Sequence, residues 1–302
     1  MSKLSRKAIL AVLSLVLTFV ALGATTFAWF SLGTTATVNP FDLEVRGSEG
    51  LEIQFGGKAD GTKADDSWYT TLNSTLMNGW LTGETGIFAD GKLDAVTTTD
   101  GINFVKLTGV IPDSPSAGVG TVTTDIATEN GDYLEFKLNF RTKDQNKKLN
   151  IEDVLFVSTG FSWAADVPFK NENGVDVDSG EAVTGNVINA VRLSFEEIGK
   201  GTATTFQAPE AAGNVGLIQY GAHNYVATKH GLNSLELPNN ELVNSALSVN
   251  SAAAAIGFSD TAVDEYYTTS VIVRVWIEGW DGNAYDAIFG EKFTVSFKFE
   301  LV

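Results

Sequence analysis

The 302-residue sequence contains no cysteine, which excludes disulfide bonds, thiolate metal sites and cysteine nucleophiles. Small secreted domains often need disulfides, but a chain of this length can bury enough apolar surface without them. Basic residues are also few: 20 Lys and Arg stand against 37 Asp and Glu, for a formal net charge of −17. Because phosphate binding needs clustered Lys and Arg, we expect no nucleic-acid partner.

Motifs for catalysis are missing as well. The sequence has no Gly-x-Ser-x-Gly, no phosphate-binding Gly-x-x-x-x-Gly-Lys and no His-Glu-x-x-His. Its two histidines, His223 and His230, are metal-ligand candidates, but we favour solvated or locally hydrogen-bonded loop residues. A carboxylate pair for glycoside hydrolysis stays open, since 37 acidic side chains offer many pairings. We expect a protein that is not an enzyme.

Ionisable side chains are absent between Lys7 and Asp42. A basic start, an apolar run and small residues up to Ala28 follow one another in the order of a secretory signal, so we expect cleavage between Ala28 and Trp29. Alternatively, the 23 uncharged residues from 8 to 30 span a bilayer as a retained helix. Either interpretation places the remaining chain outside the cell or on its surface, with membrane contact only through this segment.

Alternation of apolar and polar residues dominates after residue 40. Leu134 to Arg141 and Phe293 to Leu301 each alternate with a period of two, which predicts strands with one buried face. Shorter patterns of the same kind occur at Phe41-Leu43-Val45, Leu51-Ile53-Phe55, Val154-Phe156, Val191-Leu193-Phe195 and Val271-Val273-Val275-Ile277. Clusters of Gly, Asn, Asp and Thr separate these runs and supply turns. The pattern predicts an all-β fold, an antiparallel sandwich with long loop insertions.

Helix is a minor part of this prediction, with candidates at Leu242 to Ala255 and Ser67 to Met77. The polar, weakly periodic stretch from about 56 to 101 is interpreted as an insertion or decorated loop rather than a second core. We therefore divide the chain into residues 1–28 (signal peptide or membrane helix), residues 29–40 (an extended segment) and residues 41–302 (one sandwich domain that carries the insertion).

Calcium is the one cation with some sequence support. Two turns place oxygen ligands two or three residues apart, which hard cations can use: Asp176, Asp178 and Glu181 in the first, and Asp281, Asn283 and Asp286 in the second. Neither completes a twelve-residue EF-hand loop. The alternative, which we favour, is that these side chains bond their own backbone and build the turn.

An aromatic cluster near the carboxyl end has two interpretations. Trp276, Trp280 and Tyr285 lie within ten residues and are candidates for a carbohydrate platform. Packing is the commoner role of such residues. Trp276 is out of phase with Val273, Val275 and Ile277, so we expect it to cover the other face of the sheet.

Several segments resemble the TasA and camelysin family of Gram-positive surface and biofilm-matrix proteins. They are the run ending in Thr26-Phe27-Ala28-Trp29-Phe30-Ser31, followed by Phe41, Leu43 and Val45, and the stretches DYLEFKLNFR, NVINAVRLS and VIVRVWIEGWD with the strand from Phe293 to Val302. The resemblance implies cleavage after an alanine, a jelly-roll sandwich and assembly into extracellular fibres, with no catalytic residues. The stretch from 56 to 101 and the overall length depart from that pattern.

The uncharged segment from Trp29 to Val38 suggests a mechanism of assembly. We expect Trp29, Phe30, Leu32, Ala36 and Val38 to act as a donor strand that adds to the open sheet edge of a neighbouring copy. Head-to-tail addition that does not close makes a filament. The partners expected are therefore other copies of the chain, with cell-wall or matrix components as further candidates. The alternative is that this segment is a linker or a strand of its own sheet. A membrane-anchored adhesin or glycan-binding module is the alternative function.

Overall fold

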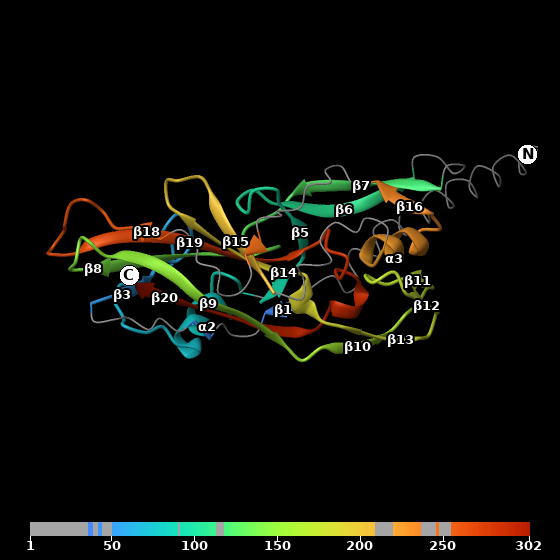
Figure 1. The fold of residues 1–302 in the computed structure, drawn as a ribbon, viewed down its shortest axis with the longest axis horizontal. Coiled ribbons are helices and arrows are strands. Elements are labelled where there is room, and N and C mark those ends of the chain that lie inside the picture. Colours follow the sequence, from blue (N-terminus) through green and yellow to red (C-terminus); the bar gives the residue numbers. More distant parts are fainter. Residues whose placement is uncertain are drawn as a thin grey trace, which may run out of the picture.

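The computed structural model describes residues 36–38, 42–43, 50–89, 91–112, 118–208, 220–236, 246–247 and 255–302. These residues form an elongated molecule in which long strands run along the main axis (Figure 1). Two sheets pack face to face, so the predicted all-β character is confirmed. The predicted cleavage site and the residues Trp29, Phe30 and Leu32 lie outside the described residues.

The larger sheet is built around three long antiparallel strands, β8, β19 and β14. Its main path runs through β16 (Ser234–Glu236), β7 (Val119–Ile126), β6 (Val105–Pro112), β5 (Ala95–Thr97), β19 (Tyr267–Glu278), β14 (Val191–Glu197), β15 (Ala203–Gln207) and β17 (Ala246–Leu247). β8 (Leu134–Thr142) pairs with β19 and carries β3 (Glu52–Phe55) on its other edge. The pairs β5–β19, β15–β17 and β7–β16 are parallel, so short parallel strands flank an antiparallel centre.

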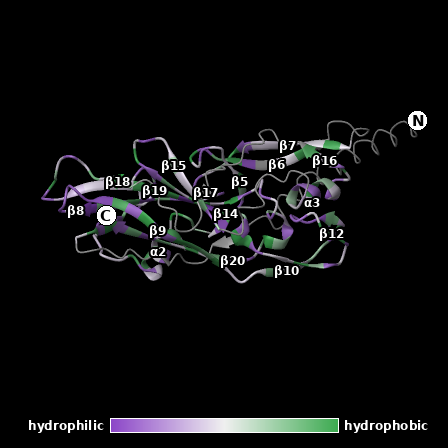
Figure 2. Ribbon diagram, in the orientation of Figure 1, coloured by the Kyte–Doolittle hydropathy of each residue, from purple (hydrophilic) through white to green (hydrophobic). Residues whose placement is uncertain are grey.

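The smaller sheet is centred on β20 (Lys292–Leu301), which pairs with β9 (Lys148–Ser158) over most of its length. The strands follow the order β18 (Ile256–Gly257), β9, β20, β1 (Ala36–Val38) and β4 (Lys92–Leu93), and β2 (Asp42–Leu43) also pairs with β20. Purple and green alternate along β9 in Figure 2, and alternate side chains of β20 are buried from Phe293 to Leu301. This is the pattern that the sequence predicted for one wet and one buried face.

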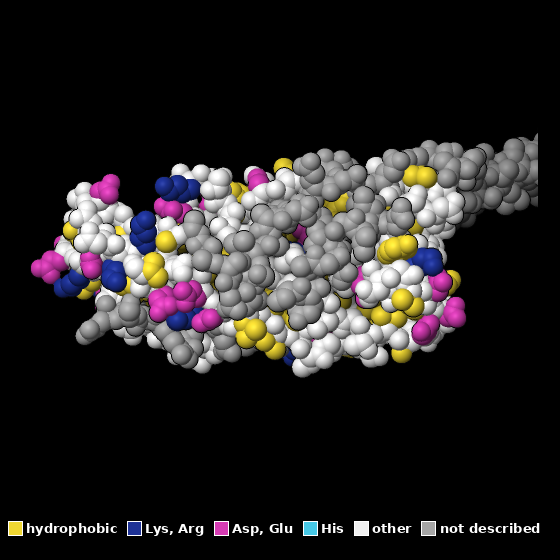
Figure 3. Space-filling model, viewed as in Figure 1, with side chains coloured by type: hydrophobic (Ala, Val, Ile, Leu, Met, Phe, Trp, Pro, Cys, Tyr) yellow, Lys and Arg dark blue, Asp and Glu magenta, His cyan; other side chains and the backbone are white. Residues whose placement is uncertain are grey.

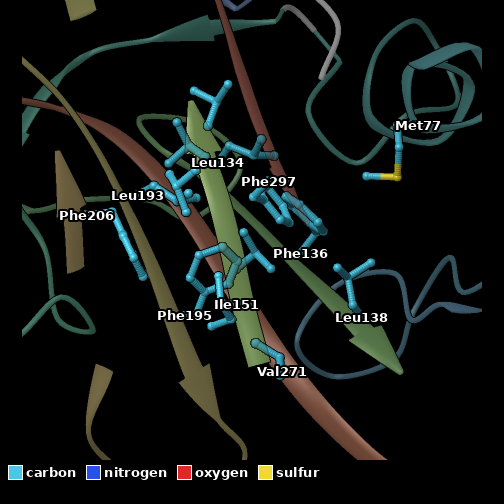
Figure 4. Packing of buried hydrophobic residues seen from close by; sticks show 14 of the residues in the cluster. Met77, Leu134, Phe136, Leu138, Ile151, Leu193, Phe195, Phe206, Val271 and Phe297 are labelled. Atoms are coloured by element: carbon cyan, nitrogen blue, oxygen red, sulfur yellow. The ribbon is translucent and has the colours of Figure 1, made fainter. Parts of the chain in front are cut away.

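The main hydrophobic core lies between the two sheets. Figure 4 shows Leu134, Phe136, Leu193, Phe195 and Phe297 gathered there with Ile151 of β9. The rings of Phe195 and Phe297 meet edge to face with centroids 4.9 Å apart, and those of Phe140 and Phe299 are 4.5 Å apart. Such aromatic pairs stabilise a core by about 0.5–1.5 kcal/mol beyond the area they bury.

The segment from residue 56 to 101 does not hang from the sandwich as a loop. It contains α2 (Ser74–Leu81), β4 and β5, and it supplies six side chains to the main core: Leu72, Met77, Leu81, Ile87, Phe88 and Leu93. The polar residues between them masked this contribution in the sequence.

A second cluster of buried residues lies beyond the main core. It joins α3 (Ala222–Lys229) to two short ribbons, β10 (Phe161–Ala164) with β13 (Ala182–Gly185), and β11 (Phe169–Lys170) with β12 (Asp176–Val177). These elements lie together at one end of the molecule in Figure 1. Two 3₁₀ turns, η1 (Val187–Asn189) and η3 (Asp286–Ile288), connect this region to the sheets.

The helix predictions were partly correct. A helix near Ser67 to Met77 exists, but it begins at Ser74, where Asn73 caps it by accepting a bond from the Leu76 N–H at 3.0 Å. Within the stretch from Leu242 to Ala255, Ala246 and Leu247 form a strand, so the helix predicted there is wrong at these two positions. The pairing of β17 with β15 decided their conformation over local propensity.

Candidate functional site

The best-defined candidate site is the strand position beside β20, which we call the β20 slot: the space between the backbones of β20 and β4. β1 fills it, parallel to β20 and antiparallel to β4. Thr37 is opposite Lys292 on one side and Lys92 on the other. The amino-terminal segment that contains Ala36 and Val38 is therefore a strand of its own sheet in this structure, which was the alternative to its role as a free donor.

The same segment follows β20 beyond β1. Val38 is opposite Phe293, and Asp42 is opposite Ser296. The amino-terminal segment therefore advances by four residues where β20 advances by three. One extra residue in a strand pair is the mark of a β-bulge.

β4, the strand on the far side of the β20 slot, is linked to the larger sheet. β4 and β5 belong to different sheets and are joined by the single residue Asp94, whose N–H donates to the Asp132 carbonyl at 2.9 Å. Lys106 forms an ion pair with the Asp94 carboxylate and another, at 2.7 Å, with Asp132. Burial raises the pKa of Asp94 although Lys106 opposes it, and the two carboxylates raise the pKa of Lys106 against the effect of its burial. This cluster ties Asp94, the residue after β4, to two residues that do not belong to β1.

The calcium candidates are engaged by protein groups. Asp281 is fully buried; its Oδ2 pairs with Arg192 Nη2 at 2.5 Å, and its Oδ1 accepts two bonds from Asn283. Asp286 accepts from the Tyr225 hydroxyl at 2.7 Å and pairs with Lys229 at 3.0 Å. The cations beside these two carboxylates are thus side chains, and the bond from the Asn283 N–H to Asp281 is of the turn-building kind that we favoured.

The first predicted calcium turn is an exposed ribbon end. Asp176 pairs with Lys170 at 2.5 Å, and Glu181 accepts a bond from the Asp178 N–H at 2.9 Å, as expected for a turn-building role. In the described part of the chain, no group of three or more His, Asp and Glu side chains is placed to hold a metal ion.

The three aromatic residues do not form an exposed platform. Trp276, Trp280 and Tyr285 are 0%, 4% and 3% exposed. Trp276 packs against Phe104 on the sheet face away from the main core, as its phase predicted. Trp280 and Tyr285 belong to the second cluster. Their burial removes the geometric basis for a sugar platform at these residues.

The two histidines lie on and just after α3. His223 is buried with its Nε2 3.0 Å from the Trp280 carbonyl, and burial lowers its pKa. Burial also lowers the pKa of His230, with Lys229 adding to the effect. His223 is therefore not a solvated loop residue, because α3, which the sequence did not reveal, carries it against Trp280. His230, which follows the helix, is partly exposed.

A buried carboxyl that we did not predict lies next to Trp276. Glu278 is 2% exposed; it accepts from Trp276 Nε1 at 3.1 Å and from the Trp280 N–H at 3.3 Å. Burial raises its pKa from 4.5 to about 7, although hydrogen bonds from Thr97 and the charge of Arg192 oppose the shift. Alternation along β19 signals that residue 278 shares a face with Trp276, but it does not show that this face is covered.

This carboxyl makes stability depend on pH. The native state holds a proton that the unfolded chain releases between pH 4.5 and 7, so the free energy of unfolding falls as pH rises through that window. In the unmodified chain, the free energy of unfolding should fall by about 3 kcal/mol between pH 5 and 8 because of this group. We expect Glu278→Gln to remove this decline, as measured by urea unfolding at each pH. Replacing the exposed Glu84 with Gln should leave the decline unchanged. An undiminished decline in the Glu278 variant would show that another group causes it.

Comparisons with known proteins found no matching family model, no matching curated protein and no matching solved structure. Among the residues that the structure describes, none of the helices is long and apolar enough to span a bilayer.

Proposed function

We propose that this chain is a secreted subunit of an extracellular filament or matrix fibre, similar to the TasA and camelysin proteins, with a jelly-roll-like sandwich and no catalytic role. The observation that carries the proposal is the way in which β1 occupies the β20 slot. The backbone pairs at residues 36–38 and 42–43 join the described amino-terminal segment to the smaller sheet. Among the residues whose burial the structure describes, those of the main core lie between Leu51 and Leu301.

Assembly follows from exchange of this segment between copies. A copy that withdraws β1 and β2 leaves one side of β20 unpaired, and the same segment of another copy offers identical pairing. The contacts are equivalent whether the segment comes from the same chain or from another. The balance between closed monomers and exchanged copies therefore depends on the protein concentration relative to the effective concentration of the chain's own segment. Each subunit donates one segment and accepts one, so open head-to-tail addition produces a filament.

The link between β4 and the larger sheet supports an accepting role. β4 stays attached through Asp94, Asp132 and Lys106 whether or not a strand lies beside it. The accepting position therefore keeps both of its walls, β20 and β4, while it is empty. If β4 could move into the empty position beside β20, an incoming strand would not find its backbone partners in register.

Cysteine pairs test the exchange directly, because the chain has no other thiol. Thr37 and Lys92 are directly opposite in an antiparallel pair, a spacing that suits a disulfide. We expect Thr37→Cys and Lys92→Cys, carried by two differently tagged copies, to form an inter-chain disulfide when mixed and oxidised during assembly. Val263→Cys, at an exposed site away from the slot, replaces Lys92→Cys in the control. A disulfide that forms only in the double variant, within one chain, would contradict the proposal.

A further inference from the structure

The ribbon β10–β13 lies where the chain must enter the β20 slot. Thr37 is opposite Lys292, and the preceding residue, Glu291, accepts bonds from the Gly160 N–H at 2.6 Å and from the Val187 N–H at 2.7 Å. Glu291 thereby ties the turn before Phe161 to the start of β20. Since β1 runs parallel to β20, Ala36, the first residue of β1, lies at this end of the strand pair.

One apolar ring of this ribbon is incompletely covered. Cross-strand pairing places Phe161 opposite Gly185 and Trp163 opposite Val183, and the residues of these two pairs share a face of the ribbon. Trp163 and Val183 pack on the second cluster, but 44% of Phe161 stays exposed. Gly185 cannot be replaced by a larger residue that would cover the ring, because a Cβ there would lie 2.5 Å from the Ala287 carbonyl.

The stretch of chain that contains Phe161 carries no charge, and the neighbouring Glu291 is buried with both carboxylate oxygens bonded to backbone N–H groups. Residues 154–165 include no ionisable side chain, although the chain as a whole has a net charge of −17. Leu155 and Val157 of the preceding strand are each 49% exposed, and Figure 3 shows apolar side chains at the surface over β9. The described residues add no third strand to the β10–β13 ribbon. This is a surface suited to an uncharged apolar segment.

The sequence supplies such a segment at the right distance. Trp29, Phe30 and Leu32 precede Ala36 by four to seven residues, and no ionisable residue lies between them. Four extended residues reach at most about 14 Å, so Leu32 can contact a ring placed beside the entrance of the slot. We propose that Phe161 and the β10–β13 ribbon receive residues Trp29 to Leu32 of the donating copy, which extends the interface beyond the β20 slot. This inference rests on the proposed function.

Cross-linking in the cysteine-free background identifies the occupant. Copies carrying Leu32→Cys are mixed with differently tagged copies carrying Phe161→Cys, allowed to assemble and treated with a short bis-maleimide. The expected product is a cross-linked pair of unlike copies, and replacing Phe161→Cys with Val263→Cys should abolish it. Cross-linking only within single chains of the double variant would show that the chain's own segment covers Phe161, and would overturn the inference.

A substitution gives a second readout. Phe161→Ser should raise the concentration needed for assembly about tenfold, because a ring that the donor segment buries is lost. Val263→Ser, the matched exposed control, should not change it. If the Thr37–Lys92 disulfide forms between copies while Phe161→Ser assembles normally and the Leu32–Phe161 cross-link is absent, the inference fails and the proposed function stands. If no Thr37–Lys92 disulfide forms between copies, both fail.

Discussion

Asp281→Ala should lower the free energy of unfolding by about 3–5 kcal/mol, because it leaves a buried guanidinium without its counter-ion. The side chains of Arg192 and Asp281 are 3% and 0% exposed and meet at 2.5 Å. The remaining bonds of Arg192 Nη1, to the carbonyls of Asn189 and Val191, do not neutralise the charge. Urea unfolding followed by tryptophan fluorescence measures the loss.

A second ion pair of the same length provides the control. Lys170 and Asp176 also meet at 2.5 Å, but their side chains are 42% and 83% exposed, so Asp176→Ala should cost less than about 1 kcal/mol. The double variant Arg192→Leu with Asp281→Leu should recover much of the stability that Asp281→Ala loses, since no charge is then buried alone. Equal losses for Asp281→Ala and Asp176→Ala would contradict the assignment of a buried pair.

Deleting Trp29 to Val38 should abolish fibres and leave a folded monomer. The deletion removes the pairs of β1 with β20 and β4 and leaves residues 51–301, which supply the described part of the main core. Electron microscopy and size-exclusion chromatography measure assembly, and circular dichroism measures folding. Fibres that grow normally from the deleted chain would rule out a donor strand in this segment.

Two further samples separate loss of the donor from loss of the fold. Thr37→Pro in the full chain removes one N–H from a strand that is paired on both sides, and it should block assembly in the same way. A synthetic peptide of residues 29–43, added in excess to the unmodified chain, should compete for the β20 slot and shorten the fibres. A scrambled peptide of the same composition should have no effect.

The long strands were predictable because each buries one face. Phe293 to Leu301 and Leu134 to Phe140 alternate without interruption, and the structure places their apolar residues in the core. The short strands β10 to β13 have two to four residues each, too few for a period to be read. α3 begins after Gly221, with φ of 60° and no side-chain cap, and its eight residues AHNYVATK give only one short apolar stripe, Ala222, Tyr225 and Val226, too little to indicate a helix. Tertiary packing, not local pattern, forms these elements.

The candidate sites were harder to predict because their partners are distant in the sequence. Asp281 meets Arg192 across 89 residues, and Asp286 meets Lys229 across 57, so local spacing alone made these carboxylates resemble calcium ligands. The extended character of the segment around Ala36 and Val38 could be predicted from its uncharged, β-branched composition. Its parallel pairing with β20 depends on a strand more than 250 residues away, which no local pattern indicates.

The most direct test of the account is an electron cryo-microscopy map of the assembled material, in which the chain is traced from Leu43 to Gly50. In every subunit, β20 should be flanked by strands of residues 36–38 and 42–43, as it is here. If this strand connects to Gly50 of a different copy, the segment is donated between subunits, as we predict. If it connects to Gly50 of the same copy throughout the fibre, the central claim is wrong.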